Sequence, residues 1–294
     1  MQDPGLDFWL NNWHWSPSVI IGILLIVGFY LYAVGPWRKR HRPEEELPSW
    51  RPFVFVLGFA IIFLALVSPL DELGDTYLFS AHMVQHLCLT LIAPPLLLLG
   101  TPAWLLEPVF AYKPLYRIAR GLTYPAVAFL LFNFDFWLWH APPLYNATLE
   151  NEGIHILEHL TFIILAVINW WPIFSPMPQE SKLGRLPLGG QILYLFLSGM
   201  PVVALGAGLT FFPPLYAPYL SVPRIWGISA ASDQQLGGLI MWVPGNIVYI
   251  LIMSVLFIRW MQNQEAKQIN EERQRDQEEA ELSASDNNAG LMNG

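Results

Sequence analysis

The sequence predicts an all-α polytopic membrane protein with seven transmembrane helices, its N-terminus outside and its C-terminus inside. Hydrophobic residues make up 54% of the 294 residues, whereas charged residues make up 13%, about half the share usual in soluble domains. Several stretches are long and apolar enough to cross a bilayer, and the basic residues fall on alternate connections between them. A soluble globule of this composition would expose much of its apolar surface to water.

Each predicted span contains about 20 mostly apolar residues, because lipid offers no hydrogen-bond partner to backbone N–H and C=O groups. The spans lie near 17–35, 52–70, 77–99, 124–140, 153–174, 188–210 and 235–259. Proline, which lacks an N–H group, lies at or near several of their ends, for example Pro36, Pro52 and Pro94. At the start of the last span, Gly237 and Gly238 predict a close approach to neighbouring helices.

The positions of Lys and Arg predict the orientation, because short loops rich in these residues stay in the cytoplasm. Fourteen of the fifteen fall on the first, third and fifth connections or after the last span, and Arg224 is the exception. We therefore expect a multi-pass protein of a bacterial-type plasma membrane. Its parts are an outer tail (1–16), a transmembrane domain (17–260) and a polar cytoplasmic tail (261–294). The cytoplasmic tail should continue the last helix briefly and then be disordered.

Two pairs of histidines lie in the outer halves of two spans. His82 and His86 belong to the third span, and His155 and His159 to the fifth. Residues four apart on a helix lie about 40° from each other, so each pair points one way. Both helices start outside, so the two pairs can face each other at one depth. Because imidazole is a common ligand for copper and zinc, these histidines predict a metal site. Polar contacts between helices are the alternative.

A polar residue precedes the second histidine of each pair, as H-x-x-Q-H with Gln85 and H-x-x-E-H with Glu158. Such neighbours can orient an imidazole, and Glu158 is also a candidate ligand or proton carrier. H-x-x-E-H occurs in zinc proteases, which leaves an intramembrane zinc hydrolase centred on Glu158 as an alternative. A haem-binding membrane electron carrier, with histidines of two spans as axial ligands, is another.

Further candidates lie on other spans. His140 ends the fourth span and is a candidate ligand, while Met241 is a candidate thioether ligand for Cu(I). Asp135 lies within the fourth span and needs a polar partner there. It is about 140° from His140 around the helix, so one regular helix cannot direct both at one ion. The sequence leaves open whether Met83, Met241 or Cys88 ligates metal.

Three sequence stretches together resemble the CtaG-type cytochrome c oxidase assembly family, the multi-span group associated with caa-type oxidases. They are HMVQHLCLTLIAPPLLLLGTPAW, FWLWHAPPLYNATLENEGIHILEHLTF followed by NWWP, and DQQLGGLIMW. The resemblance covers roughly 50–260 and implies a seven-span protein needed to make active haem–copper oxidase. The polar positions that the family shares map here onto His82, Gln85, His86, His140, His155, Glu158, His159, Asp233 and Gln234.

We therefore expect a copper-binding assembly factor, a chaperone rather than an enzyme. Copper is expected as Cu(I) on the histidines and Met241, with zinc as the second choice. Gln85, Glu158, Asp135 and Asp233 are expected around these ligands. The expected partners are the lipid bilayer and cytochrome c oxidase subunits in the same membrane, and nothing in the sequence indicates nucleic-acid binding. The sequence does not determine which metal is bound or which copper centre of the oxidase receives it. It also leaves open the role of the tail and the oligomeric state, for which a homo-oligomer is one possibility.

Overall fold

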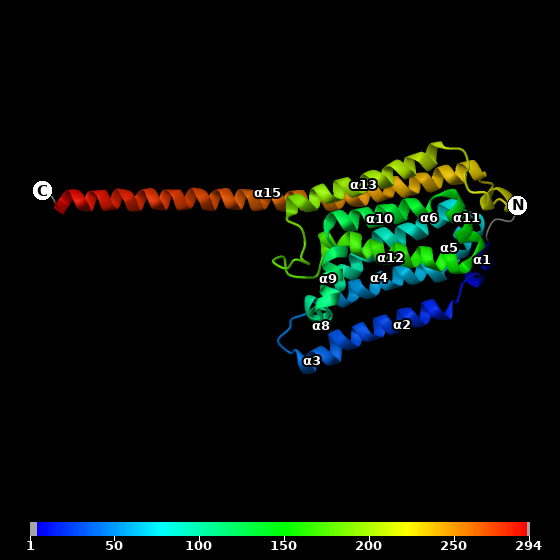
Figure 1. Cartoon of the computed structure of the whole chain (residues 1–294), viewed down its shortest axis with the longest axis horizontal. Coiled ribbons are helices and arrows are strands. Elements are labelled where there is room, and N and C mark those ends of the chain that lie inside the picture. The colour runs from blue at the N-terminus through cyan, green and yellow to red at the C-terminus, as the bar shows by residue number, and fades with distance from the viewer. Residues whose placement is uncertain (1–4, 293–294) are drawn as a thin grey trace.

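Long helices lying side by side make up most of the protein (Figure 1). The computed structural model describes the backbone of residues 5–292 and the side chains of residues 5–280. These residues form helices and no strand, so the predicted all-α fold is confirmed.

In the part of the chain that the structure describes, six helices are long and apolar enough to cross a bilayer, and a bent helix pair raises the number to seven if it counts as one span. The six are Pro17–His41, Trp50–Val67, Phe79–Gly100, Glu152–Phe174, Leu188–Phe211 and Ala230–Ala280. They match six of the seven predicted stretches in order along the chain. The protein is therefore a multi-pass membrane protein, while its orientation in the bilayer stays a prediction.

The bent pair corresponds to the fourth predicted span. It consists of α9 (Lys113–Leu122) and α10 (Pro125–Trp139), which meet at an angle of 68°. Pro125 explains the break, because a proline disfavours the helical conformation in the residue before it. Tyr124 accordingly has an extended backbone, with φ −60° and ψ 126°. At about 1.5 Å per residue, α10 alone is about 22 Å long, shorter than the ~30 Å hydrocarbon core of a bilayer.

The third span is interrupted where two prolines follow each other. Its parts are α6 (Phe79–Leu87), the π-helical turn η3 (Cys88–Ile92) and α7 (Ala93–Gly100). Pro94 and Pro95 have no N–H to donate to the Thr90 carbonyl, so this oxygen needs another partner. The indole of Trp170 supplies it, donating from Nε1 to the Thr90 oxygen over 2.9 Å. The π-helical turn thus lies directly after the segment that carries His82 and His86.

The first span stands furthest from the bundle and is the least buried of the six. It combines α2 (Pro17–Tyr32), η1 (Ala33–Trp37) and α3 (Arg38–His41). It contacts α4 (Trp50–Val67) and the end of the third span, where the Tyr30 hydroxyl donates to the Gly100 carbonyl over 2.6 Å. The remaining short elements are α1 (Leu6–Asn11), α5 (Pro69–Glu72), η2 (Leu73–Tyr77), α8 (Ala103–Ala111), α11 (Pro142–Glu150) and α14 (Pro218–Ser221).

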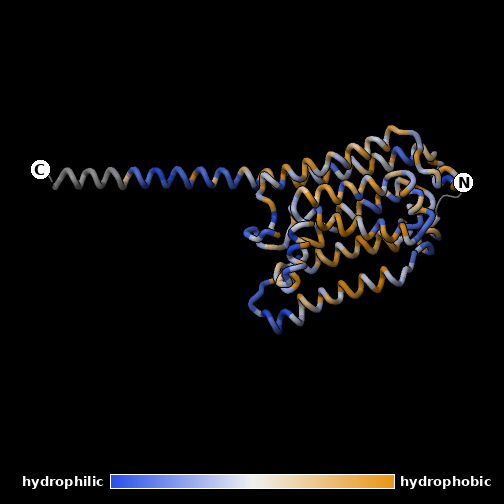
Figure 2. Tube along the Cα trace, in the orientation of Figure 1, coloured by the Kyte–Doolittle hydropathy of each residue, from blue (hydrophilic) through white to orange (hydrophobic). Residues whose placement is uncertain are grey.

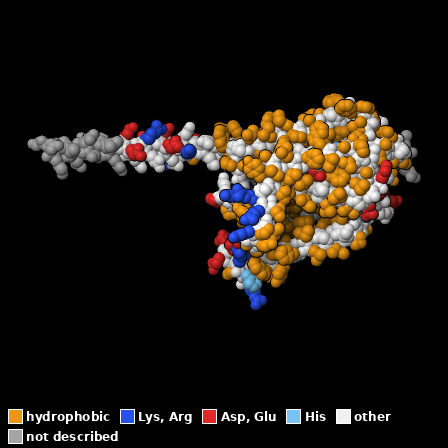
Figure 3. All heavy atoms as spheres, in the orientation of Figure 1, with side chains coloured by type: hydrophobic (Ala, Val, Ile, Leu, Met, Phe, Trp, Pro, Cys, Tyr) orange, Lys and Arg blue, Asp and Glu red, His pale blue; other side chains and the backbone are white. Residues whose placement is uncertain are grey.

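Apolar side chains cover most of the face of the bundle that the space-filling view presents (Figure 3). Polar side chains are buried inside it, most of them towards the end that carries α5 and α11, which we call the α11 end. The third span is the most buried of the six, because 61% of its apolar 18-residue stretch is buried inside the protein. A bundle with apolar residues outside and polar residues inside suits a lipid surround.

The last two long helices pack closely. α13 (Leu188–Phe211) lies along α15 (Ala230–Met292), and their backbones approach closely where glycines meet, at Gly206 and Gly238. A Cβ on Gly238 would lie 2.6 Å from the Thr210 nitrogen, and one on Gly237 would overlap the Phe79 ring of α6. The close approach predicted from these two glycines is confirmed.

The polar tail differs from the expectation of disorder, because α15 continues as a helix to Met292. Residues 261–280 are exposed and hydrophilic along this extension (Figure 2). Glu, Gln, Lys, Arg and Ala form helices readily, and Lys267 pairs with Glu271 one turn later at 3.6 Å. The tail leaves from the end of the bundle that carries α3 and α9. The basic loops gather there, so we call it the basic end (Figure 3).

Candidate metal centre

The two histidine pairs lie on neighbouring helices that start at the α11 end. α6 carries His82 and His86, and α12 (Glu152–Phe174) carries His155 and His159. The start of α12 is capped by Asn151, whose side chain accepts a hydrogen bond from the Ile154 amide over 3.1 Å. Both pairs therefore lie within the first eight residues of their helices, at the same end of the bundle.

The start of α6 is held by a carboxylate from another helix. Asp233, in the first turn of α15, accepts hydrogen bonds from the amides of Phe79 and Ser80 over 2.8 and 3.1 Å. It also accepts the Ser80 hydroxyl over 2.5 Å. These amides are among the four that a helix start leaves unpaired, so Asp233 acts as a cap supplied from a distance.

Four side chains converge between α6 and α12. His82, His155, Glu158 and His159 each offer one ligand atom, and these atoms all lie within 4.8 Å of one another. Three imidazoles and a carboxylate are a suitable donor set for zinc or copper. We call these four residues the His3Glu cluster. Three of its four members are buried, and His155 is partly exposed.

The cluster's polar atoms lack ordinary partners among the described residues. Both ring nitrogens of His82, Nε2 of His159 and both carboxylate oxygens of Glu158 are buried without a hydrogen bond. His82 and Glu158 are fully inaccessible to solvent. A buried polar atom without a partner costs free energy, and so many together are unusual in a native protein. A bound cation would supply the missing partner for one nitrogen of each imidazole and for the carboxylate, so the residues present fit a metal ion.

Asp75 is a further acidic neighbour, which the motif analysis missed. Its Oδ1 lies 3.3 Å from His82 Nδ1 and 3.3 Å from His155 Nε2. The approach is tight, because a Cβ on Gly74 would lie 3.0 Å from the backbone nitrogen of His82. Burial raises the pKa of Asp75 to about 6. A carboxylate on the far nitrogen of a ligating imidazole orients the ring and increases its basicity, so Asp75 can support His82 in this way.

An open cavity leads to the cluster from the α11 end. A cavity of about 390 Å³ opens there, with His155 and His159 in one wall. Its polar lining also includes His14, Asp71, Glu72, Asp75, Glu150 and Glu152. We call this cavity the vestibule. Its acidic lining favours cations over anions in front of the cluster.

His86 lies one helical turn deeper than His82 and outside the four-residue group. Its Nε2 is 3.6 Å from Glu158 Oε1, whereas His82 Nε2 is 3.9 Å from Glu158 Oε2. The rings of His82 and His86 are 4.2 Å apart. Glu158 therefore stands between the two histidines of α6.

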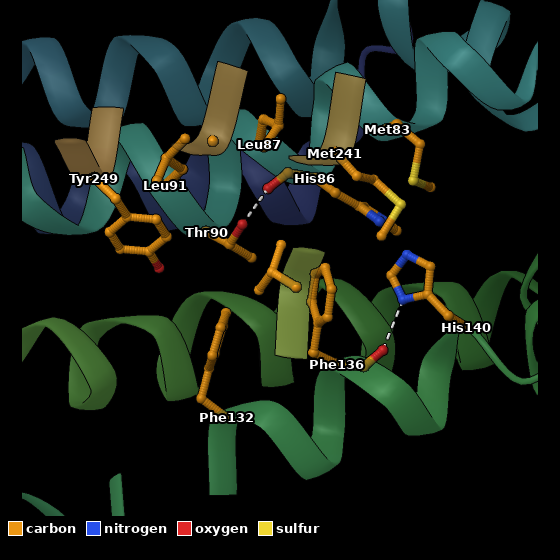
Figure 4. Close-up of a pocket in the computed structure, with 12 residues that line it drawn as sticks. Met83, His86, Leu87, Thr90, Leu91, Phe132, Phe136, His140, Met241 and Tyr249 are labelled. Carbon is orange, nitrogen blue, oxygen red and sulfur yellow. Dashed lines mark hydrogen bonds between the residues drawn. The ribbon is translucent and has the colours of Figure 1, made fainter. Parts of the chain in front are cut away.

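His140 and Met241 lie beside His86 rather than within the His3Glu cluster. The rings of His86 and His140 are 5.7 Å apart, and His140 Nδ1 is 2.7 Å from the Phe136 carbonyl oxygen. Met241 is buried and lines one cavity together with both histidines and Met83 (Figure 4). The structure thus divides the predicted ligands into two adjoining groups.

The other polar residues singled out in the sequence have partners elsewhere. Gln85 points away from the histidines and donates from Nε2 to Asp71 over 2.6 Å and to the Ala65 carbonyl over 2.9 Å. Asp135 accepts the Trp139 indole over 3.0 Å. Cys88 packs in an apolar cluster between α4 and the third span. Together with Asp233, these residues hold the helices in place.

Comparisons with known proteins relate the chain to one family. Residues 28–263 match the family described as cytochrome c oxidase caa3 assembly factor (Caa3_CtaG). Uncharacterised proteins of Mycobacterium bovis and Mycobacterium tuberculosis are each 25% identical to the chain over 305 residues, and one of Mycobacterium leprae is 26% identical over 298. These alignments cover 94–95% of this chain but 43–44% of the relatives, so the chain spans less than half of their length. No solved structure matches it.

The family match covers most of the chain and includes every member of the His3Glu cluster as well as His86, His140 and Met241. It ends shortly after the last apolar segment, so most of the polar tail lies outside it. On this match, the chain belongs to the cytochrome c oxidase caa3 assembly factor family.

Proposed function

We propose that this protein binds copper, as Cu(I), in the His3Glu cluster and delivers it to a cytochrome c oxidase subunit in the same membrane. The observation that carries the proposal is the convergence of four buried ligand atoms within 4.8 Å, most of them without another partner. Copper is here the cargo of an assembly factor, and no chemical conversion is assigned to the protein.

The donor set supports transfer as well as binding. The cluster contains imidazoles and a carboxylate but no thiolate. Cys88, the single cysteine of the sequence, is close to His86 along the chain but packs in a different cluster. Imidazole suits copper and zinc alike, so the cluster by itself does not discriminate between them. The buried thioethers of Met83 and Met241 next to it favour the softer ion, Cu(I).

The orientation that this function requires has the α11 end, with its vestibule and cluster, on the outer side of a plasma membrane. The gathering of Lys and Arg at the opposite end supports it, because such loops stay in the cytoplasm. A copper ion arriving from outside then meets the acidic vestibule before it reaches His155 and His159. The oxidase subunit that receives the ion would dock at the same end.

The proposal is tested by copper content and oxidase activity measured on the same variants. Full-length protein is purified from copper-supplemented cells, and copper per protein is determined by mass spectrometry. His155→Ala combined with His159→Ala should lose most of the copper, and cytochrome c oxidase activity in the cells should fall with it. His41→Ala, an exposed histidine at the basic end, is the matched control and should retain both. Full copper in the double variant, at normal membrane levels, would refute the proposal.

The same preparation distinguishes the two alternatives. A haem-binding electron carrier would show a Soret band in the optical spectrum of the purified protein. A zinc hydrolase would contain zinc, and Glu158→Gln would abolish proteolysis while the zinc stayed bound. An assembly factor that carries copper shows neither a Soret band nor proteolysis that depends on Glu158.

A further inference from the structure

Besides the vestibule, a much smaller cavity lies directly beside the His3Glu cluster. Its volume is about 30 Å³, enough to hold a water molecule or a metal ion. Its potential ligands are Met83, His86, His140 and Met241, which come from α6, the end of α10 and α15. In the view of Figure 4, both thioether sulfurs lie at the same end of the cavity as the two imidazoles. We call these four residues the His2Met2 group.

The nitrogens of this group lack partners among the described residues, as those of the first cluster do. Both ring nitrogens of His86 and Nε2 of His140 are buried without a hydrogen bond. The hydrogen bond of the His140 side chain joins Nδ1 to the Phe136 carbonyl oxygen, which leaves Nε2 directed into the cavity (Figure 4). A neutral imidazole with a free, buried nitrogen costs free energy unless a donor or a cation occupies the space before it.

The two methionines are held in place by tight packing between α6 and α15. Met83 is 0% and Met241 2% exposed. A Cβ on Gly237 would lie 3.3 Å from Met83 Cγ and would overlap the Phe79 ring, so only glycine lets α15 come this close. This approach brings Met241, one turn further along α15, to the cavity that Met83 lines. Such a defined placement is what a ligand pair requires.

We infer that the His2Met2 group is a second metal site, selective for a soft monovalent cation such as Cu(I). Thioether sulfur prefers Cu(I) to the divalent ions of the first transition row. The remainder of the lining consists mostly of apolar side chains, including Leu91, Phe132 and Phe136, with no carboxylate among the described residues. Without a negative ligand, a divalent cation costs far more to bury than a monovalent one. Zn²⁺ is therefore excluded from this site and restricted to the His3Glu cluster.

Glu158 connects the two sites. One oxygen faces His82 at 3.9 Å, and the other faces His86 at 3.6 Å. A Cu(I) ion can therefore pass from the cluster to the second site by exchanging ligands one at a time, without entering an apolar gap. This inference rests on the proposed function for the ion that arrives. It adds an inner position where Cu(I) is held away from water and from competing divalent metals.

The test counts metal ions in the full-length protein purified in detergent, using Ag⁺ as a redox-inert substitute for Cu(I). Wild type should bind two equivalents of Ag⁺ and one of Zn²⁺. Met83→Leu combined with Met241→Leu conserves volume and should lose one Ag⁺ while retaining the Zn²⁺. Met200→Leu, on the exposed surface of α13, is the control and should bind as wild type does. His155→Ala with His159→Ala should lose the Zn²⁺ and the other Ag⁺.

A spectroscopic measurement separates ligation from packing. Protein labelled with selenomethionine should show a silver–selenium distance in X-ray absorption, which is absent when both Met83 and Met241 are leucine. Methionines that only fill space give no such signal, and that outcome would overturn the second site.

The metal counts tell the failures of the two proposals apart. If the double leucine variant retains both Ag⁺ ions, the second site is wrong. A single Ag⁺ in wild type that is lost only with His155 and His159 refutes the second site and leaves the proposed function standing. A single Ag⁺ lost only with the two methionines supports the second site and removes the first. Wild type without bound Ag⁺ refutes both.

Discussion

The Glu158 carboxylate lies between the two histidines of α6, 3.9 Å from His82 Nε2 and 3.6 Å from His86 Nε2. It is fully buried and accepts no hydrogen bond from the described residues. A carboxylate in this position contacts one histidine of each group without lining the second cavity, whereas the glutamine at the equivalent place on α6, Gln85, binds Asp71 and Ala65 instead. The two similar motifs therefore have different roles.

Glu158→Gln should weaken copper binding by about 10–100-fold without unfolding the protein. The amide has the same shape but no charge to offset that of the cation, and losses of this size are typical when a supporting carboxylate is removed. Competition with a chelator of known copper affinity measures the effect. Glu152→Gln, on the exposed start of the same helix, is the control and should bind copper as tightly as wild type.

Asp75→Asn should also weaken copper binding by about 10–100-fold, because the carboxylate orients the imidazoles of His82 and His155 from 3.3 Å. Glu72→Gln is the matched control, since Glu72 lines the same vestibule and its side chain bonds to Thr76 rather than to a histidine. Equal affinities of the Asp75 and Glu72 variants would show that Asp75 contributes only to the charge of the vestibule.

Asp233→Ala should lower the melting temperature, because it leaves the amides of Phe79 and Ser80 at the start of α6 without their acceptor. Losing a helix cap typically costs about 1 kcal/mol, and burial makes this loss larger. Ser232→Ala, at the exposed neighbouring position, should leave the melting temperature unchanged. Thermal unfolding in detergent, followed by fluorescence of the tryptophans, compares the two. A stable Asp233→Ala protein would mean that α6 needs no such anchor.

The orientation predicts which engineered cysteines react with an impermeant reagent in intact cells. In a Cys88→Ser background, Glu150→Cys and Ser221→Cys at the α11 end should be labelled, and Glu180→Cys at the basic end should not. All three positions are exposed, so access from one side of the membrane decides the result. Labelling of Glu180→Cys in intact cells, with the other two silent, would reverse the orientation.

Deleting residues 270–294 should leave copper content unchanged. The described part of this segment is exposed, extends from the basic end and lies beyond the family match. The comparison is copper per protein in the truncated and full-length forms at equal membrane levels. A proportional loss of copper in the truncated form would assign the tail a part in metal loading.

Much of the fold follows from local features of the sequence. The apolar stretches located six of the spans, because a helix is the one element that satisfies its backbone within lipid. The composition of the fourth stretch also predicted a span. The bend of 68° before Pro125 was not predicted and is visible only in the structure. Disorder in the tail was expected from its polarity, yet its residues are good helix formers and α15 continues through them.

The histidine pairs were the part of the site that local geometry could identify. Spacing of four residues places two imidazoles on one face of any helix, whatever surrounds it. Asp75 escaped notice because it lies in a short π-helical turn, η2, between two spans and reaches His82 only through a backbone approach that Gly74 permits. Nothing in the periodicity of the chain encodes that contact.

The sequence by itself determined that this is a helical membrane protein with ionisable groups gathered near one end of its spans. Only the tertiary structure decided that Glu158 joins His82, His155 and His159, and that His86 and His140 face two methionines instead. The physical reason is that spacing sets the direction of side chains within one helix. The rotation of one helix against the next depends on contacts between distant residues, such as Gly237 with Phe79 and Asp233 with the start of α6.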